Sequence, residues 1–141
     1  MRQIVWMVAA LLAAAIGVAP ARAEIMAQVS LSQQTMTVTV DGVDTYVWPV
    51  STARRGFVTP KGKWGAQSMH RMHYSSLFNN APMPFTIFYN GHYAIHGTTE
   101  VKKLGRPASA GCVRLHPDNA RILFNLVKER GPRTLQVVVD G

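Results

Sequence analysis

The sequence has little of three things: cysteine, acidic side chains and long apolar segments. Cys112 is the only cysteine among 141 residues, so an internal disulfide is excluded. Acidic side chains number 7 against 15 lysines and arginines, which gives a formal net charge of +8. Beyond Pro20 no apolar run is long enough to cross a bilayer. The length allows one compact domain and no more.

The N-terminal segment has the order of parts of a secretory signal peptide. Arg2 supplies a positive start, an apolar run extends from Ile4 to Ala19, and Ala21-Arg22-Ala23 is a small-x-small cleavage pattern. The run is shorter than the roughly 18–20 residues that span a bilayer, which disfavours an uncleaved anchor. We therefore predict a signal peptide over residues 1–23 and a mature domain over 24–141, exported to the periplasm or cell-wall compartment.

The charge of the mature domain does not select a partner. Cleavage would leave 13 basic and 7 acidic side chains, about +6. A basic exported protein can meet anionic lipid or an acidic cell wall, whereas export argues against nucleic acid. The basic side chains are scattered along the chain without a basic helix, so most of them are expected to be solvated. No second hydrophobic face is evident, and we expect a monomer.

Short segments in which apolar and polar residues alternate predict a mainly β fold in a single domain. Asp41-Gly42 and Asn90-Gly91 are signals for tight turns between paired strands. Residues 51–84 are rich in Gly, Pro, Ser and Asn, and we expect mostly loop there, with one short strand near Trp64 and one wall of a cleft. The expected strands cover residues 29–31, 36–40, 45–50, 85–89, 93–96 and 134–139, with a short buried segment over 111–115.

One helix is expected after the cysteine. Pro117 suits the first turn of a helix, and Gly131-Pro132 is a stop signal. Between them Leu123, Leu126 and Val127 form one apolar stripe.

The neighbours of Cys112 favour a reactive thiol over a merely buried one. Gly111 lets the backbone approach a ligand closely and allows successive N–H groups to point at one spot, as an oxyanion hole requires. Ser109 can hydrogen-bond to nearby backbone or to a substrate. Arg114 carries a fixed charge that can bind a carboxylate through two hydrogen bonds.

A reactive thiol needs a base, and His96 is the best placed of the five histidines. It ends an apolar strand and is followed at once by Gly97 and Thr98. The others have simpler explanations: His70 and His73 lie in the expected polar loop, His92 flanks a turn, and His116 precedes the helix.

The motif around these two residues resembles the signature of L,D-transpeptidase catalytic domains, also called YkuD domains. It comprises Ile95-His96-Gly97-Thr98, then Gly105-Arg106-Pro107, then Ser109-Ala110-Gly111-Cys112-Val113-Arg114-Leu115. Trp48-Pro49-Val50-Ser51-Thr52 and Thr59-Pro60-Lys61-Gly62 are similar to the family's upstream strand and loop. The likeness extends from about Ile25 to Val139. It departs at Ala110, where many members have a second histidine.

The resemblance implies roles for individual residues. Cys112 matches the acylated nucleophile and His96 the general base. Gly111 and the Cys112 amide match the oxyanion-stabilising backbone, Ser109 a supporting hydroxyl, and Arg114 a residue near the substrate carboxylate or the thiol. Gly97 and Thr98 fall into the substrate-binding set.

The resemblance also implies a fold and a reaction. The fold would be a β-barrel or sandwich, with the cysteine where a strand leads into the helix. A cysteine acyltransferase of this kind would attack a peptidoglycan stem tetrapeptide, release the terminal D-alanine and pass the acyl group to an acceptor amine without a cofactor. The acceptor would be another stem or a wall-anchored protein, and water would make the enzyme an L,D-carboxypeptidase.

Two further interpretations remain open at the level of sequence. His92-x3-His96 and Cys112-x3-His116 have the spacing of zinc ligands. Four residues along a strand span about 13 Å, however, so both rings of the first pair could not reach one ion, and no metal site is predicted. The other interpretation is a non-catalytic wall-binding module, because a fold does not guarantee turnover.

Overall fold

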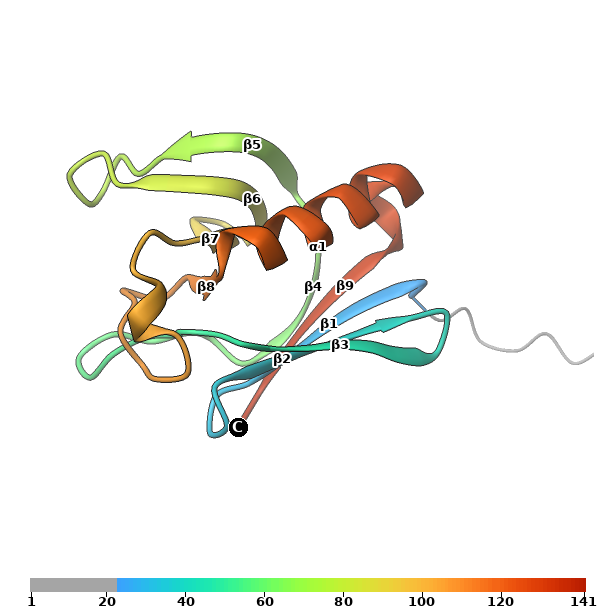
Figure 1. The fold of residues 1–141 in the computed structure, drawn as a ribbon, viewed down its shortest axis with the longest axis horizontal. Coiled ribbons are helices and arrows are strands. Elements are labelled where there is room, and N and C mark those ends of the chain that lie inside the picture. The colour runs from blue at the N-terminus through green and yellow to red at the C-terminus, as the bar shows by residue number, and fades with distance from the viewer. Residues whose placement is uncertain (1–22) are drawn as a thin grey trace, which may run out of the picture.

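The computed structural model describes residues 23–141, which form two β-sheets, one α-helix and two short 3-10 helices (Figure 1). The predicted signal peptide, apart from Ala23, lies outside the described residues. The prediction of a mainly β, sandwich-like fold with one helix after Cys112 is confirmed.

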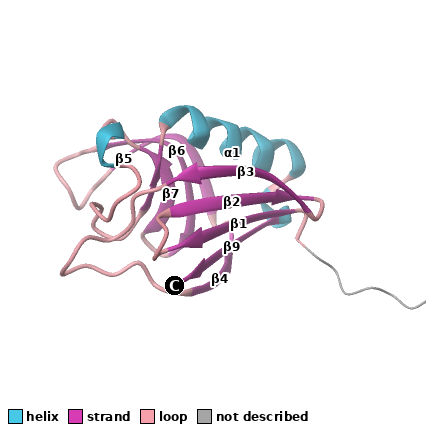
Figure 2. Cartoon of the chain, turned by 60° about the horizontal axis from the view of Figure 1, so that its bottom comes forward, coloured by secondary structure: helices cyan, strands magenta, loops and turns pink. Residues whose placement is uncertain are grey.

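The first sheet has the strand order β3-β2-β1-β9-β4 (Figure 2). Its strands are β1 (Ile25–Ser30), β2 (Thr35–Val40), β3 (Val43–Pro49), β4 (Gly62–Gly65) and β9 (Leu135–Asp140). Neighbours are antiparallel except β1 and β9, which run parallel. The predicted hairpin turn joins β2 to β3, with positive φ at Asp41 (51°) and Gly42 (80°). Positive φ at both central residues is what a two-residue turn needs to match the twist of its strands.

The second sheet has the strand order β5-β6-β7-β8 and carries the sequence motif. Its strands are β5 (Ser68–Tyr74), β6 (Pro82–Asn90), β7 (Tyr93–Gly97) and β8 (Val113–Leu115). β5, β6 and β7 pair antiparallel, and β7 pairs with β8 in parallel. The turn between β6 and β7 consists of Gly91 and His92, one residue later than the predicted Asn90-Gly91.

The prediction of mostly loop over residues 51–84 was wrong in one respect. The expected short strand near Trp64 exists as β4, but β5 also forms inside this range and β6 already begins at Pro82. His70 and His73 therefore lie on a strand and not in a loop. The sequence hides β5 because most of its side chains are exposed on both faces, so no apolar alternation marks it.

The helix α1 (Pro117–Arg130) begins and ends where the sequence predicted. His116 caps its start, because the Nδ1 atom of His116 accepts a hydrogen bond from the Asp118 amide at 3.1 Å. The buried face consists of Ala120, Leu123, Phe124 and Val127, whereas Leu126 of the predicted stripe is only partly buried. This face packs on β6 and β7. The 3-10 helices η1 (Val101–Lys103) and η2 (Pro132–Thr134) are single turns in the connections.

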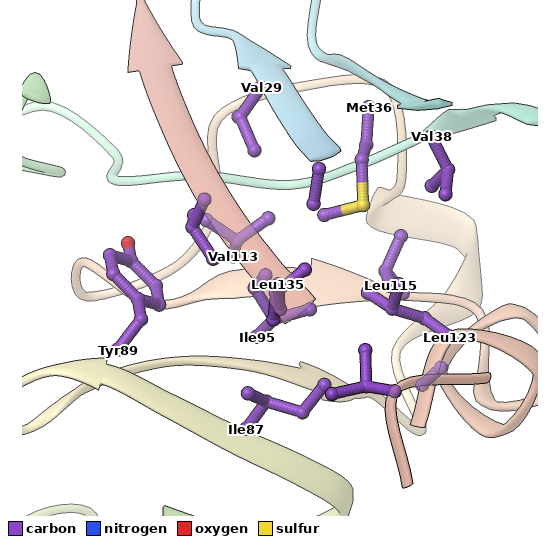
Figure 3. Close-up of a cluster of buried hydrophobic side chains, with 14 of the residues drawn as sticks. Val29, Met36, Val38, Ile87, Tyr89, Ile95, Val113, Leu115, Leu123 and Leu135 are labelled. Carbon is purple, nitrogen blue, oxygen red and sulfur yellow. The ribbon is translucent and has the colours of Figure 1, made fainter. Parts of the chain in front are cut away.

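The core lies between the two sheets and positions the motif. Figure 3 shows Val29, Met36 and Val38 of the first sheet facing Ile87, Ile95 and Leu115 of the second. Burial of each such side chain contributes about 1.5–3 kcal/mol. This free energy strongly fixes which side chains of β7 and β8 point into the core and which point away from it. Within residues 23–141, no helix has the length and apolar character that a membrane crossing requires.

Candidate active site

A cavity of about 680 Å³ contains both Cys112 and His96 in its wall. Three regions enclose it: the loop between β3 and β4, the β5–β6 hairpin, and the segment around β7 and β8. The first two agree with the expected cleft wall. The lining residues are Arg54 and 56–58 from the loop; His73, 75–78, 81–83 and Phe88 from the hairpin; and His92, Tyr93, His96, 98–100, Ser109, Ala110, Cys112 and Arg114 from the third region.

The register of β7 and β8 brings the two residues to the same side of the sheet. Ile95 pairs with Val113 and His96 with Arg114. Ile95 and Val113 are buried in the core, so the alternating positions His96, Arg114 and Cys112 face the cavity instead. With strands about 4.8 Å apart and about 3.3 Å per residue, the Cα atoms of diagonal neighbours lie ~8 Å apart, within reach of both side chains.

The sulfur of Cys112 lies against the start of β7. Its Sγ atom donates to the His92 carbonyl oxygen at 3.7 Å. Burial raises the pKa of the Cys112 thiol above its ordinary value; the Ala94 amide and the charge of Arg114 lower it without reversing that direction. The resting group is therefore a thiol rather than a thiolate near neutral pH.

The imidazole of His96 is held as a neutral base. It is 6% exposed, and its Nδ1 atom lies 2.7 Å from the Gly97 carbonyl oxygen. A carbonyl can only accept, so Nδ1 carries the hydrogen and Nε2 keeps its lone pair. Burial lowers the pKa of His96 to about 4; the charges of Arg114 and His73 act in the same direction, and the hydrogen bond to Gly97 opposes them.

A small hydrogen-bond network fixes the backbone before the cysteine. Ser109 Oγ accepts from the Gly111 amide at 3.0 Å and donates to the Cys112 carbonyl oxygen at 2.6 Å. Thr59 Oγ1 donates to the Gly111 carbonyl oxygen at 2.8 Å and accepts from the Ala53 amide at 3.0 Å. Because the Gly111 amide is already bonded to Ser109, the Cys112 amide is the remaining candidate from this pair for an oxyanion.

Gly111 occupies a position where any side chain would be both crowded and strained. Its φ is +135°, and a Cβ there would lie 2.7 Å from Tyr93 Cε1 and 3.0 Å from the Val58 carbonyl oxygen. The absent side chain lets the Tyr93 ring and the β3–β4 loop close over the backbone next to the sulfur.

The remaining predicted site residues divide into lining and supporting positions. Arg114 and the buried Thr98 line the cavity. Gly97 does not; a Cβ there would lie 3.0 Å from Pro117 Cα and from Pro84 Cγ, so it allows close packing of β7 against its neighbours. Its carbonyl nevertheless orients His96.

Several lining residues were not predicted from the sequence. Arg54, Phe57 and Tyr93 were not singled out, and His73 was assigned to a surface loop. His73 stacks edge-on against Phe88 with ring centroids 5.0 Å apart. Its register partner on β6 is Met83, so the place of His73 in the cavity wall follows from the pairing of β5 with β6. Of the five histidines, His92 is exposed and His116 caps α1, as expected.

The zinc interpretation gains no support. Among residues 23–141, no group of three His, Cys, Asp or Glu side chains is arranged to hold a metal ion. His116 is engaged at the start of α1, and His92 lies in the turn before β7.

The comparison with known proteins gives one consistent family. The family described as L,D-transpeptidase catalytic domain matches residues 25–139. A protein of Bacillus subtilis (strain 168), named for an L,D-transpeptidase activity, is 25% identical over 103 residues, which are 70% of this chain and 58% of that protein.

Solved structures agree with this match. An L,D-transpeptidase from Stackebrandtia nassauensis is similar with a TM-score of 0.74 and 27% identity, covering 86% of this chain and 57% of that one. An L,D-transpeptidase from Mycobacterium smegmatis gives a TM-score of 0.74 at 21% identity, covering 84% and 59% of the two chains; this likeness shows the shared fold. The chain thus spans less than two thirds of the length of these relatives.

The raised pKa of Cys112 predicts the pH dependence of its alkylation by iodoacetamide, a neutral reagent. Because only the thiolate reacts, the rate should rise roughly tenfold per pH unit between pH 6 and 8. At any pH in this window the folded protein should react more slowly than the same protein unfolded in urea. A preformed thiolate–imidazolium pair would instead give a rate independent of pH across this range and faster in the folded state.

The crowding at Gly111 predicts a different outcome from an open glycine. Gly105 also has positive φ (+91°), but a Cβ there would meet no atom within 4 Å. Gly105→Ala should cost only backbone strain, roughly 1–3 kcal/mol in urea unfolding. Gly111→Ala adds a clash with Tyr93 and should also change the alkylation rate of Cys112 in the folded state. Equal effects of the two substitutions on both measurements would contradict the assigned role of Gly111.

Proposed function

The chain belongs to the L,D-transpeptidase catalytic domain family, and we propose that it is a peptidoglycan L,D-transpeptidase in which Cys112 is the nucleophile and His96 the general base. The observation that carries this proposal is their common cavity: the thiol of Cys112, directly before β8, and the neutral imidazole of His96, on the parallel strand β7, face the same space. The buried Nδ1–H bond to Gly97 supports the assignment, because it leaves Nε2 as the basic atom.

The first half-reaction transfers an acyl group from the donor to sulfur. Sγ of Cys112 attacks the carbonyl carbon of the third residue of a stem tetrapeptide while Nε2 of His96 takes the thiol proton. The carbonyl oxygen becomes an oxyanion, which the Cys112 amide is proposed to stabilise. When the intermediate collapses, the C–N bond to the terminal D-alanine breaks and His96 returns the proton to the leaving amine.

The two pKa values decide the timing of the proton transfer. The thiol pKa lies above its ordinary value of 9.0, and that of His96 is about 4. Both shifts disfavour a free thiolate–imidazolium pair. Proton transfer is therefore coupled to formation of the C–S bond, and His96 acts as a base on a thiol rather than as the partner of a resident thiolate.

The second half-reaction releases the product from sulfur. An acceptor amine attacks the thioester, His96 takes a proton from this amine, and the proton returns to Sγ as the C–S bond breaks. A stem peptide as acceptor gives a cell-wall cross-link, and a wall-anchored protein gives a protein–wall link. Water in the same step would make the enzyme an L,D-carboxypeptidase.

Site residues other than Cys112 and His96 are proposed to prepare the geometry. Ser109 and Gly111 fix the backbone before the sulfur through the hydrogen bonds to Gly111 N and Cys112 O. Arg114 offers a guanidinium beside His96 for a substrate carboxylate, and Gly97 orients the imidazole. Thr98 lines the substrate cavity.

The mechanism predicts the behaviour of two variants with a tetrapeptide donor and an amine acceptor. Cys112→Ala should abolish both the covalent acyl-enzyme in intact-mass spectra and the release of D-alanine. His96→Gln should lower turnover by roughly 10²–10⁴-fold, the usual contribution of a general base.

Three outcomes are distinguishable in this experiment. Turnover by Cys112→Ala would exclude the proposed nucleophile. Tripeptide as the only product of the wild-type protein would favour the carboxypeptidase. A wild-type protein that forms neither adduct nor product, while Cys112 remains open to alkylation, would leave a non-catalytic wall-binding module as the better description.

Export is proposed from the N-terminal sequence pattern. Expression of the full chain in a bacterial host should yield a product in the extracytoplasmic fraction whose N-terminal residue is Glu24, because cleavage is expected after Ala23. Substituting Ala21 and Ala23 by bulky charged residues should block cleavage and retain the longer mass. A cytoplasmic product that begins at Met1 would contradict the proposal.

A further inference from the structure

Arg54 is an exposed cation on the cavity wall whose backbone is fixed next to the cysteine segment. Its amide donates to the Ser109 carbonyl oxygen at 2.9 Å, and the Ser109 amide donates to Thr52 at 2.9 Å. Ala53 and Ser109 form a parallel bridge. The guanidinium therefore extends from a point anchored three residues before Cys112, although 58 positions separate Arg54 from Cys112 in the sequence.

The side chain of Arg54 is also held. Its Cζ atom lies 4.2 Å from the centroid of the Phe57 ring, a cation–π contact, and Nη1 reaches the Ala108 carbonyl oxygen at 3.4 Å. A guanidinium has five N–H donors, so these contacts leave several of them available. Among residues 23–141, Arg54 forms no ion pair with a carboxylate.

The charges around the cavity favour an anion at this position. Among the residues that the structure describes, Arg54 and Arg114 are the two guanidinium groups in its wall, and Glu100 is the one carboxylate. Glu100 is paired with Lys103, which neutralises it. Arg114 follows Cys112 on β8, whereas Arg54 is anchored at Ser109 before it. One positive group is thus attached to the segment before Cys112, and the other belongs to the strand after it.

We propose that Arg54 binds a free carboxylate of the donor peptide and determines specificity for anionic stems. The inference rests on the proposed function and adds to it a residue that the sequence motif does not contain. A guanidinium already stacked on an aromatic ring loses little side-chain freedom on binding, and its planar fork matches a carboxylate. The carboxylate is either that of the terminal D-alanine or one on the acyl side of the scissile bond.

Arg55 provides a matched control. It is adjacent, equally cationic and exposed, but it does not line the cavity. Arg54→Gln and Arg55→Gln remove the same charge from the protein, so long-range effects of net charge are equal in the two variants. Arg54→Gln also loses the contacts with Phe57 and the Ala108 carbonyl oxygen, so donor peptides with and without each carboxylate are needed to separate that loss from a contact with the substrate.

The test measures kcat/KM for three donor tetrapeptides: one with all carboxylates free, one amidated at the terminal D-alanine, and one amidated on the acyl side. For the wild-type protein, the amidation that removes the partner of Arg54 should lower kcat/KM by roughly 10-fold, the size expected of a hydrogen bond to a charged group. Arg54→Gln should show a similar loss with the free peptide and little further loss on that amidation. Arg55→Gln should behave as the wild type.

One amidation should lower kcat/KM for the wild-type protein but not for Arg54→Gln, and the position of that amidation identifies which carboxylate Arg54 binds. The rate of Cys112 alkylation by neutral iodoacetamide should be unchanged in both variants, which shows that the site is intact. Arg54 has no such role if both amidations lower kcat/KM for Arg54→Gln as much as for the wild-type protein. The same holds if Arg55→Gln becomes as insensitive to amidation as Arg54→Gln. Failure of the wild-type protein to turn over any of the peptides would count against the proposed function instead.

Discussion

The parallel pairing of β7 with β8 is the constraint on which the rest of the site depends. Its register places Ile95 opposite Val113, and both side chains are buried in the core between the sheets. A slip of one residue would turn apolar side chains toward the cavity and His96 toward the core, a loss of several buried side chains at about 1.5–3 kcal/mol each. The free energy that stabilises the fold therefore also keeps His96, Arg114 and Cys112 on one face. No interaction between the imidazole and the sulfur is needed to hold them there.

Burial shifts the pKa values of His96 and Cys112 in opposite directions, and both shifts suit a general-base mechanism. It lowers the pKa of His96 and raises that of Cys112, so each group rests in its neutral form. A lone thiol is chemically vulnerable as a thiolate, and it is less so when protonated and bonded to the His92 carbonyl oxygen. In the proposed mechanism, reactivity then arises only as the carbonyl carbon of a donor peptide reaches the sulfur. Burial affects Tyr89 in the same way as Cys112. Its hydroxyl has no hydrogen-bond partner among the described residues, and burial, with the nearby Cys112 and Tyr93, raises the pKa of Tyr89.

The sequence predicted the parts of the fold that local patterns determine. The turn at Asp41-Gly42, the strand that ends at Gly97 and the helix between Pro117 and Gly131 follow from residue types within a few positions of one another. β5 could not be predicted in this way, because it exists through its ladder with β6 and not through an apolar face. The site shows the same division. His96 and Cys112 stand out in the motif, whereas the anchoring of Thr59 to Gly111, and of Arg54 to Ser109, is a contact across more than fifty residues that no local pattern encodes.

The β3–β4 loop consequently connects the scaffold to the cavity in which we propose that the substrate binds. Ser51 exchanges two backbone hydrogen bonds with Arg114, at 3.0 and 2.9 Å, so the loop continues the second sheet beyond β8. Farther along, Thr59 fixes the Gly111 carbonyl oxygen, and Val58 closes against the face of Gly111 that lacks a side chain. Between these two anchors, Arg54 and Phe57 extend into the cavity wall. Because both ends of the loop are bonded to the segment that carries the cysteine, side chains in its middle keep a fixed relation to the sulfur. In the proposed function, residues there can change which peptide is bound without any change to the pairing that brings Cys112 and His96 together.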